Sequence, residues 1–300
     1  MIMTSLPNRT AVARRLRPFR LAVQKSGRLT DDSLRLLREC GLSLGHQEAR
    51  LVLPAANLPL DVLFLRDDDI CDAVASGVAD AGILGDNVVT EHGCRAMIVR
   101  RLGFARCRLS IAMPRGMDYS GTNDLRGLRI ATSYPRLLND FLRRQGVVAD
   151  VHEISGSVEI APSIGLADAI CDLVSSGSTL LMNGLREVET VMQSEAVVIV
   201  NDAVNEATVT ERDRLLFRID AVLRARSMRA IFLNAPNAAL ADIIHLLPGL
   251  QSPTVMPLAR PAWSSVHAVI PEDRFWDIID ELRANGAEGI LVTPIEKLIE

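Results

Sequence analysis

Aromatic side chains and long apolar runs are both scarce in this sequence. Only 4% of the 300 residues are Phe, Trp or Tyr, which argues against a stacking platform for single-stranded nucleic acid. No apolar run approaches the length that spans a bilayer. The formal net charge of −4 is spread along the chain and shows no basic surface for nucleic acid. We therefore expect no nucleic acid and no membrane as partner.

Cysteine and histidine are too few and too scattered to form a framework. The five cysteines are odd in number and contain no CxxC pair, so reduced, buried thiols are expected. The five histidines never occur at metal-ligand spacing. No Ser/His/Asp or Cys/His arrangement is evident either. The sequence thus favours chemistry that needs neither a histidine- or cysteine-bound metal nor a covalent nucleophile.

The first twenty residues contain five arginines and no acid, but no apolar segment of a secretory signal. An organelle presequence is one interpretation and a solvated basic tail is the other. We favour the tail and expect a cytoplasmic protein. The arginines are Arg9, Arg14, Arg15, Arg17 and Arg20.

The residues that are abundant indicate an α/β fold with several domains. The chain is 48% hydrophobic, and its Ala, Leu, Ile and Val are typical of covered strands. Segment 77–83 (Gly-Val-Ala-Asp-Ala-Gly-Ile) resembles segment 165–170 (Gly-Leu-Ala-Asp-Ala-Ile), and each enters a buried apolar run. We interpret this as two α/β lobes of similar build with a cleft between them. Chance similarity of common residues is the alternative.

Regular elements can be placed along the chain. Strands are expected at 20–24, 60–65, 81–85, 109–113, 128–132 and 147–152, with 197–200 returning to the first lobe. Helices are expected after a cap at 30–32, after 67–69, over 135–144 and over 211–225. From residue 229 the predicted order is β-α-β-β-α-β, a ferredoxin-like unit. The expected domains are lobe I at 1–112, completed by 197–224, lobe II at 113–196, and a regulatory domain at 225–300.

A loop rich in glycine and hydroxyl groups, Ser155-Gly156-Ser157, is the most informative local feature. It lies between an extended segment and an apolar run that can be helical. Such a loop can present backbone N–H groups and hydroxyls to a phosphate at a helix N-terminus. Glu153 and Glu159 flank it, where sugar hydroxyls or Mg²⁺ could be held. An ordinary capped strand–helix turn is the alternative.

A second polar turn, Lys25-Ser26-Gly27-Arg28, follows the first strand. Lysine as a point charge and arginine as a fork can both reach a polyphosphate, although a solvated face is the alternative. The acids at 67–69 suggest a metal cluster at first sight. Adjacent acids at a helix start point in different directions, so a dipole role or an arginine partner is the better interpretation.

Several motifs together resemble those of the long-form ATP phosphoribosyltransferase family. They are Gln24-Lys25-Ser26-Gly27-Arg28-Leu29, Arg66-Asp67-Asp68-Asp69-Ile70, Ala131-Thr132-Ser133-Tyr134-Pro135, Ser155-Gly156-Ser157-Val158-Glu159, Gly165-Leu166-Ala167-Asp168-Ala169-Ile170-Cys171-Asp172, Asn183-Gly184-Leu185-Arg186-Glu187-Val188 and Leu250-Gln251-Ser252-Pro253-Thr254-Val255. They occur in order over nearly all of 20–300, whereas the arginine-rich start lies outside the pattern.

The resemblance implies a periplasmic-binding-protein-like pair of catalytic domains and a C-terminal domain that binds histidine as feedback inhibitor. It implies that adenine N1 of ATP attacks C1 of phosphoribosyl pyrophosphate, releasing pyrophosphate in the first step of histidine biosynthesis. It also implies Mg²⁺, carried mainly by the substrate phosphates, and a homo-oligomer of dimers and hexamers. Since adenine N1 carries a lone pair, positioning and charge stabilisation suffice for catalysis.

Site residues follow from the resemblance together with the residue chemistry. Ser155, Gly156, Ser157 and Val158 are expected to hold the 5′-phosphate. Gln24, Lys25, Gly27 and Arg28 are expected at the substrates, with Lys25 and Arg28 as the candidates for a catalytic role. Glu153 is the candidate metal ligand, and Glu159 shares that role or only complements a helix dipole. Tyr134 stacks on adenine or is a buried aromatic. Asp168 binds a ribose hydroxyl or caps its strand locally.

The family's histidine pocket maps onto Asn234, Leu250, Ser252 and Thr254. Asn234 stands where relatives can have Asp, so its contact with the ligand's amino group would be uncharged. Two rival functions remain: a two-lobed solute receptor and the effector domain of a transcriptional regulator. The first lacks an export signal here, and residues 1–19 are too short for the helix-turn-helix of the second.

Overall fold

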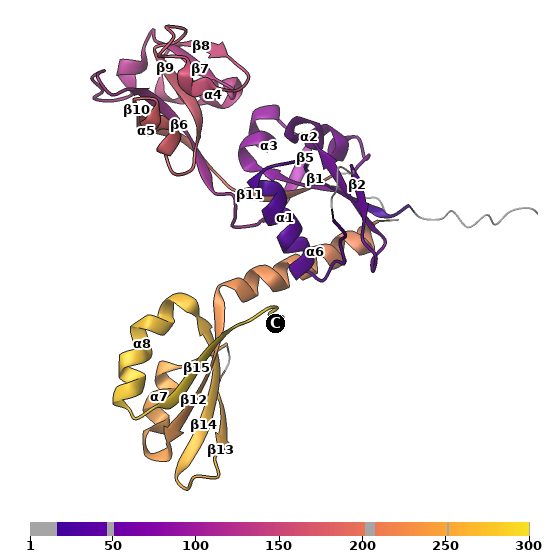
Figure 1. The fold of residues 1–300 in the computed structure, drawn as a ribbon, viewed down its shortest axis with the longest axis vertical. Coiled ribbons are helices and arrows are strands. Elements are labelled where there is room, and N and C mark those ends of the chain that lie inside the picture. Colours follow the sequence, from indigo (N-terminus) through magenta and orange to yellow (C-terminus); the bar gives the residue numbers. More distant parts are fainter. Residues whose placement is uncertain (1–16, 47–50, 202–207, 251, 300) are drawn as a thin grey trace, which may run out of the picture. The chain divides into compact units, whose positions relative to one another are not determined.

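The computed structural model describes residues 17–46, 51–201, 208–250 and 252–299. It divides into two compact units, Met1–Ser33 with Leu42–Asp213, and Leu34–Gly41 with Arg214–Glu300. The described part of the first unit contains two sheets, and that of the second contains one (Figure 1). Arg9, Arg14 and Arg15 of the basic start lie outside the described residues. Within the described ranges, no helix is long and apolar enough to cross a membrane.

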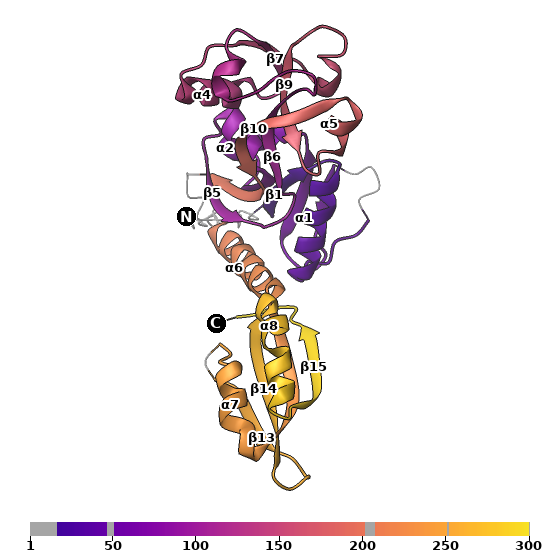
Figure 2. The same ribbon diagram turned by 90° about the vertical axis from the view of Figure 1, so that its left-hand side faces the viewer.

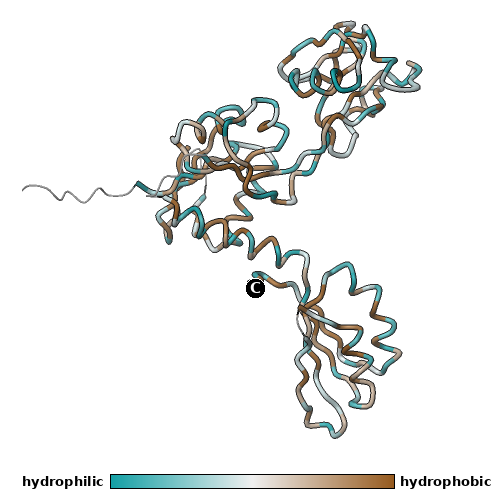
Figure 3. Tube along the Cα trace, turned by 180° about the vertical axis from the view of Figure 1, so that it is seen from behind, coloured by the Kyte–Doolittle hydropathy of each residue, from teal (hydrophilic) through white to brown (hydrophobic). Residues whose placement is uncertain are grey.

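Lobe I is built on a six-stranded sheet of order β2-β3-β1-β4-β11-β5. β1 (Phe19–Gln24), β3 (Leu60–Leu65) and β4 (Ala81–Gly85) are parallel. β11 (Ala196–Asn201) returns antiparallel between β4 and β5 (Ala96–Arg101), which confirms the predicted return of the chain. The short β2 (Val52–Pro54) is the outer strand. β4 and β11 are buried at nearly every residue, as expected of strands in a sheet covered on both faces, and Figure 3 shows hydrophobic stretches in the interior of this part of the chain.

The helices of lobe I follow these strands. α1 (Arg28–Glu39), α2 (Asp67–Ala75) and α3 (Asp86–His92) start directly after β1, β3 and β4. The prediction that Thr30–Asp32 caps α1 is wrong, because Gly27, with φ of 105°, makes the turn and the helix begins at Arg28. The carbonyl of Gly27 accepts from the amides of Thr30 and Asp31, so Thr30 already lies in the first turn.

Lobe II is built on a five-stranded sheet of order β10-β6-β9-β7-β8. Its strands are β6 (Cys107–Pro114), β7 (Arg129–Thr132), β8 (Asp150–Glu153), β9 (Ala169–Val174) and β10 (Leu185–Ser194). β7, β8 and β9 are parallel. α4 (Pro135–Gln145) follows β7, and the short α5 (Ser178–Met182) follows β9. The chain passes between the lobes twice, from β5 to β6 and from β10 to β11.

The two similar sequence segments form the same structure in both lobes. The amide of Asp80 donates to the carbonyl of Arg20 at 2.8 Å, and the amide of Arg20 donates to the Asp80 carboxylate at 2.8 Å. In lobe II, Asp168 and Arg129 exchange the same two bonds at 2.8 and 2.9 Å. Each aspartate therefore joins the amino ends of two parallel strands, and the prediction of two lobes of similar build is confirmed.

The C-terminal unit has the predicted β-α-β-β-α-β order. Its elements are β12 (Met228–Pro236), α7 (Leu240–Leu246), β13 (Thr254–Pro257), β14 (Trp263–Pro271), α8 (Glu272–Ala284) and β15 (Glu288–Pro294), preceded by α6 (Val209–Arg226). The antiparallel sheet has the order β13-β14-β12-β15. Alternate residues of β12, such as Ile231 and Leu233, pack in one cluster with residues of α7 and α8. Both helices lie on this one face of the sheet (Figures 1 and 2).

Candidate functional site

The polar loops of both lobes lie at the carboxyl ends of parallel strands. In lobe I, β1 and β3 end side by side at Gln24 and Leu65, and the turns after them carry Lys25–Arg28 and Arg66–Asp67. In lobe II, the loops after β7, β8 and β9 lie on one edge of the sheet because these strands are parallel. Ligands of open α/β sheets bind outside the carboxyl ends of the strands. These two edges therefore define the candidate site.

The loop after β8 is anchored at its base and exposed at its tip. The amide of Ile154 donates to the Thr132 carbonyl at 3.0 Å, and the Ser133 hydroxyl donates to the Ile154 carbonyl at 2.7 Å. Gly156 and Ser157 have φ angles of 76° and 49°, two successive left-handed residues. Such a turn directs consecutive N–H groups toward one side, the geometry of an anion-binding nest.

The N–H groups of this loop are available. Within the described part of the chain, no acceptor is hydrogen-bonded to the amides of residues 155–159. Val158 beneath them is buried in the lobe II core, so the donors are held on a packed base. The predicted helix N-terminus is wrong here. Only a single 3-10 turn (Val158–Ile160) follows the loop, so any anion would be held by the nest and not by a helix dipole.

A second loop of the same type follows β9 at the same edge and was missed by the sequence reasoning. It contains Ser175, Ser176, Gly177 and Ser178, and Gly177 has φ of 80°. The Ser176 and Ser178 hydroxyls are hydrogen-bonded at 3.0 Å. The criterion applied to 155–157, glycine among hydroxyls after a buried strand, would have identified it. Lobe II thus offers two loops for anionic groups.

The lobe I turn combines exposed cations with a glycine. Lys25, Gly27 and Arg28 are all exposed. Gln24, at the end of β1, donates from Nε2 to Oδ2 of Asp67 at 3.0 Å. Burial raises the pKa of the Asp67 carboxyl, and the neighbouring Asp68 raises it further. The edge therefore carries two cations beside one half-buried acid.

The acids at 67–69 diverge, as expected of adjacent side chains at a helix start. Asp67 faces Gln24, whereas Asp68 lies 3.0 Å from Nε2 of His92. Among the described residues, no group of three His, Cys, Asp or Glu is placed to hold a metal ion. The described cysteines are all free thiols, and Cys40, Cys71 and Cys171 are buried.

Tyr134 connects the two edges. It precedes α4 in lobe II, and its hydroxyl accepts from Nδ2 of Asn87 in lobe I at 3.3 Å. Burial raises the pKa of the Tyr134 hydroxyl, and the carboxylates of Asp172 and Asp67 raise it further. Tyr134 therefore lies within electrostatic reach of one acid from each lobe.

Asp172 is a further acid at the lobe II edge, to which the sequence analysis assigned no role. It lies near the carboxyl end of β9, next to Cys171, which pairs with Thr132. Burial raises the pKa of its carboxyl, and the charge of Glu159 raises it further. Glu159 thus lies close to Asp172 beside the β8 loop, while Glu153 is exposed at the end of β8. A half-buried acid at a carboxyl edge is a signal that only tertiary placement provides.

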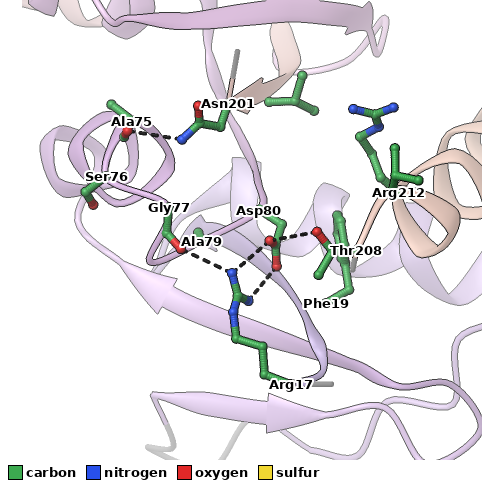
Figure 4. A pocket seen from close by; sticks show the side chains of 12 residues that line it. Arg17, Phe19, Ala75, Ser76, Gly77, Ala79, Asp80, Asn201, Thr208 and Arg212 are labelled. Carbon is green, nitrogen blue, oxygen red and sulfur yellow. Dashed lines mark hydrogen bonds and ion pairs between the residues drawn. The ribbon is translucent and has the colours of Figure 1, made fainter. Parts of the chain in front are cut away.

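Asp168 lies on the opposite, amino edge of the lobe II sheet. Its carboxylate pairs with Arg129 at 2.7 Å, and the hydrogen bonds from Arg129 hold the pKa of Asp168 below its usual range. The structure thus separates it from the β8 loop and favours the local cap over a ribose contact. The corresponding edge of lobe I contains a cavity of about 480 Å³, where Arg17 forms a two-pronged ion pair with Asp80 (Figure 4).

Asp168→Asn is accordingly expected to reduce stability and to leave substrate affinity unchanged. The loss should be about 1 kcal/mol, since both partners are partly exposed, or about 2–4 °C in Tm. Because the folded pKa is depressed, the contribution is present above about pH 4, the pKa of an unfolded aspartate, and disappears as the pH falls further. Thermal melts at pH 7 and pH 3 measure it. A raised KM with an unchanged Tm would instead indicate that Asp168 contacts the ribose.

Of the four residues predicted to bind the inhibitor histidine, the structure brings only three together. A hollow of about 780 Å³ in the C-terminal unit is lined by Leu250, Ser252 and Thr254, together with Phe232 and His267. Asn234 does not line it. This side chain lies instead beside Gly289 of the neighbouring strand β15, where its Nδ2 would meet an added Cβ at 3.3 Å. Three of the four residues thus share one cavity.

The chain is similar to known proteins over nearly its whole length. The family model described as ATP phosphoribosyltransferase matches residues 66–221, and the model described as HisG, C-terminal domain, matches 225–297. The ATP phosphoribosyltransferase of Cytophaga hutchinsonii is 53% identical over 282 residues, covering 94% of this chain and 99% of that protein. That of Bacteroides fragilis (strain ATCC 25285) is 53% identical over 281 residues, again 94% and 99%.

Among solved structures, one chain of the ATP phosphoribosyl transferase (HisG:HisZ) complex from Thermotoga maritima is similar. It superposes with a TM-score of 0.57 at 25% identity, covering 67% of this chain and 98% of its own.

Proposed function

The chain belongs to the ATP phosphoribosyltransferase family, which opens histidine biosynthesis, and we propose that its substrates bind between the two carboxyl edges described above. The observation that carries this proposal is the contact made by Tyr134. This lobe II residue accepts a hydrogen bond from Asn87 of lobe I, and the carboxylates of Asp67 and Asp172 both raise its pKa. A site assembled from both lobes suits a reaction that joins two phosphorylated substrates.

The substrates carry three anionic groups that must be held apart: the 5′-phosphate and the pyrophosphate of phosphoribosyl pyrophosphate, and the triphosphate of ATP. The amides at 155–158, which donate to no acceptor among the described residues, hold the 5′-phosphate, and the loop at 175–178 holds a second anionic group. Lys25 and Arg28 neutralise polyphosphate oxygens from lobe I. As the C1–O bond to pyrophosphate breaks and the bond to adenine N1 forms, positive charge develops on the ribose. Asp67 and Asp172 are the half-buried acids available to stabilise it.

Mg²⁺ is part of this proposal, and the residues present fit it. Mg²⁺ prefers one or two carboxylates together with substrate phosphates over a complete protein cage. The lobe II edge offers Asp172, the exposed Glu153 and the half-buried Glu159 as oxygen donors. Bound to pyrophosphate, the ion neutralises the charge of the leaving group. Tyr134 is proposed to border the adenine, and packing of its ring against the lobe II core would hold it in position.

An ultraviolet assay of adenine N1 ribosylation tests the function directly. The full chain is supplied with ATP, phosphoribosyl pyrophosphate and Mg²⁺, and pyrophosphate release is followed in parallel. We expect both signals to rise together and to require each substrate. A chain that binds phosphoribosyl pyrophosphate but releases no pyrophosphate would instead be a two-lobed receptor.

The C-terminal unit is proposed to bind histidine in the hollow lined by Leu250, Ser252 and Thr254, and the chain is proposed to form dimers and hexamers. Two hydroxyls beside an apolar wall suit a small zwitterion. The cytoplasmic location stays a prediction that follows from the proposed pathway.

Ser252→Ala combined with Thr254→Val is expected to raise the histidine concentration for half inhibition about thirtyfold, since two hydrogen bonds are lost. Each lost hydrogen bond is worth about 1 kcal/mol, and 1.4 kcal/mol is a factor of ten. Activity without histidine should not change. Asn234→Ala serves as the comparison, since Asn234 lies outside the hollow, and it should shift inhibition less than threefold. If Asn234→Ala weakened inhibition by histidine more than the double variant did, the histidine site would lie at Asn234 and not in the hollow.

A further inference from the structure

Helix α3 of lobe I meets the amino end of helix α4 of lobe II through Glu91. Oε1 of Glu91 accepts from the amide of Arg136 at 2.8 Å, and Oε2 accepts from the amide of Leu137 at 2.9 Å. One turn earlier on α3, Asn87 donates to the Tyr134 hydroxyl. α3 therefore contacts three groups at the start of α4, the Tyr134 hydroxyl and the amides of Arg136 and Leu137.

This contact replaces a cap that α4 lacks within its own lobe. α4 starts with Pro135, and the residue before it, Tyr134, makes no side-chain capping bond. The first amides of a helix have no intrahelical acceptor, and a carboxylate at this end also complements the helix dipole. Hydrogen bonds to an ionised acceptor are about twice as strong as neutral ones. The amino end of α4 is thus satisfied by a residue of the other lobe.

The other end of α3 is fixed where the chain crosses between the lobes. The amide of Asn87 donates to the Ser194 hydroxyl at 3.0 Å, and that hydroxyl donates to Oδ1 of Asn87 at 2.8 Å. Both residues are buried. Ser194 ends β10, just before the chain returns to lobe I. α3 is therefore held at its start by the crossover and at its end by Glu91, so it acts as a strut between the two lobes.

We propose that Glu91 is a positioning residue that sets the separation of the two substrate-binding edges by capping α4 across the lobes. The inference rests on the proposed function, since α4 begins beside Ser133 and Tyr134 at the lobe II edge. Glu91 touches no reacting atom in this proposal. Its carboxylate fixes where Tyr134 and the β8 loop stand relative to Lys25 and Arg28.

Glu91→Asp separates positioning from simple capping. Aspartate keeps the charge and can still cap α4, but it is shorter by one C–C bond, about 1.5 Å. Because misplacement by about 1 Å can lower a rate about 100-fold, we expect kcat to fall at least tenfold. The amides of Arg136 and Leu137 should stay protected in hydrogen exchange, and Tm should change little. A cap with only a structural role would leave kcat at the wild-type value in this variant.

Glu91→Ala completes the test, with Asp140→Asn as the matched control. Asp140 is a carboxylate of α4 whose partner, Arg143 at 2.9 Å, belongs to the same helix. Glu91→Ala should expose the amides of Arg136 and Leu137 to exchange at least tenfold faster and lower kcat/KM about 100-fold, whereas the control should change neither. The proposal would be overturned if Glu91→Ala exposed these two amides to exchange but kept the wild-type kcat/KM. It would also be overturned if the amides stayed as protected from exchange as in the wild type. A wild-type chain without transferase activity would refute the proposed function alone, since hydrogen exchange still reports the cap.

Discussion

Replacing Gly156 and Ser157 by alanine is expected to raise the KM for phosphoribosyl pyrophosphate about 100-fold while Tm falls by only a few degrees. Gly156 has φ of 76°, where a Cβ adds roughly 1–2 kcal/mol of strain. The loop can relieve that strain by rotating its amides out of the nest, and Ser157→Ala removes one hydroxyl as well. Losing one or two hydrogen bonds to a charged group, each about 1.5–3 kcal/mol, gives a change of this size.

Gly165→Ala is the matched control for this loop. Gly165 has the same φ of 76°, and an added Cβ would likewise meet no atom within 4 Å. It lies before Asp168, on the amino edge of the lobe II sheet, away from the proposed phosphate. The control should show a similar fall in Tm, about 2–6 °C, with an unchanged KM. Equal effects of the two changes on KM would mean that the β8 loop acts only through folding.

Arg28→Gln is expected to lower kcat/KM about 100-fold without loss of stability. Arg28 is the first residue of α1, and a cation at this end of a helix opposes the dipole. Among the described residues no acidic side chain forms an ion pair with it. Glutamine should therefore leave Tm unchanged or raise it slightly. The loss of activity follows from the loss of a fork-shaped donor to polyphosphate, since charged hydrogen bonds to phosphate are strong.

Arg35→Gln provides the comparison on the same helix. Arg35 is exposed two turns later, and its ion pair with Glu39 at 3.9 Å is the kind of surface contact that contributes little. Steady-state kinetics and thermal melts of both variants should show an activity loss only for Arg28→Gln. If that variant keeps wild-type kcat/KM, Arg28 belongs to a solvated face and the lobe I edge lacks its proposed phosphate fork.

Features that depend on neighbouring residues could be predicted from the sequence. The Gly-x-Ala-Asp-Ala segments predicted two similar lobes, because each places an aspartate where two parallel strands begin, as Asp80 and Asp168 do. The order of strands and helices after residue 228 predicted the C-terminal fold. The glycine and hydroxyls at 155–157 predicted an exposed polar loop, and φ angles of 76° and 49° agree with that composition.

Short apolar runs were less informative, and the helix predicted after the β8 loop shows the reason. A run of a few apolar residues suits either a buried strand or a helix, and periodicity cannot separate them at that length. Here Val158–Ile160 makes one 3-10 turn, and the next regular element is β9. The phosphate proposal therefore rests on left-handed residues and free amides instead of a helix dipole.

The sequence alone determined the family, the order of elements in the C-terminal unit and the polar loops at 25–28 and 155–157, because these features depend on runs of adjacent residues. Tertiary structure alone decided that Asp172 is half buried near Glu159, that Asn234 lies outside the hollow of the C-terminal unit, and that Glu91 caps a helix of the other lobe. Glu91 and Arg136 are 45 positions apart in the chain. Contacts of that kind leave no local pattern, since they arise only when separately folded sheets bring their edges together.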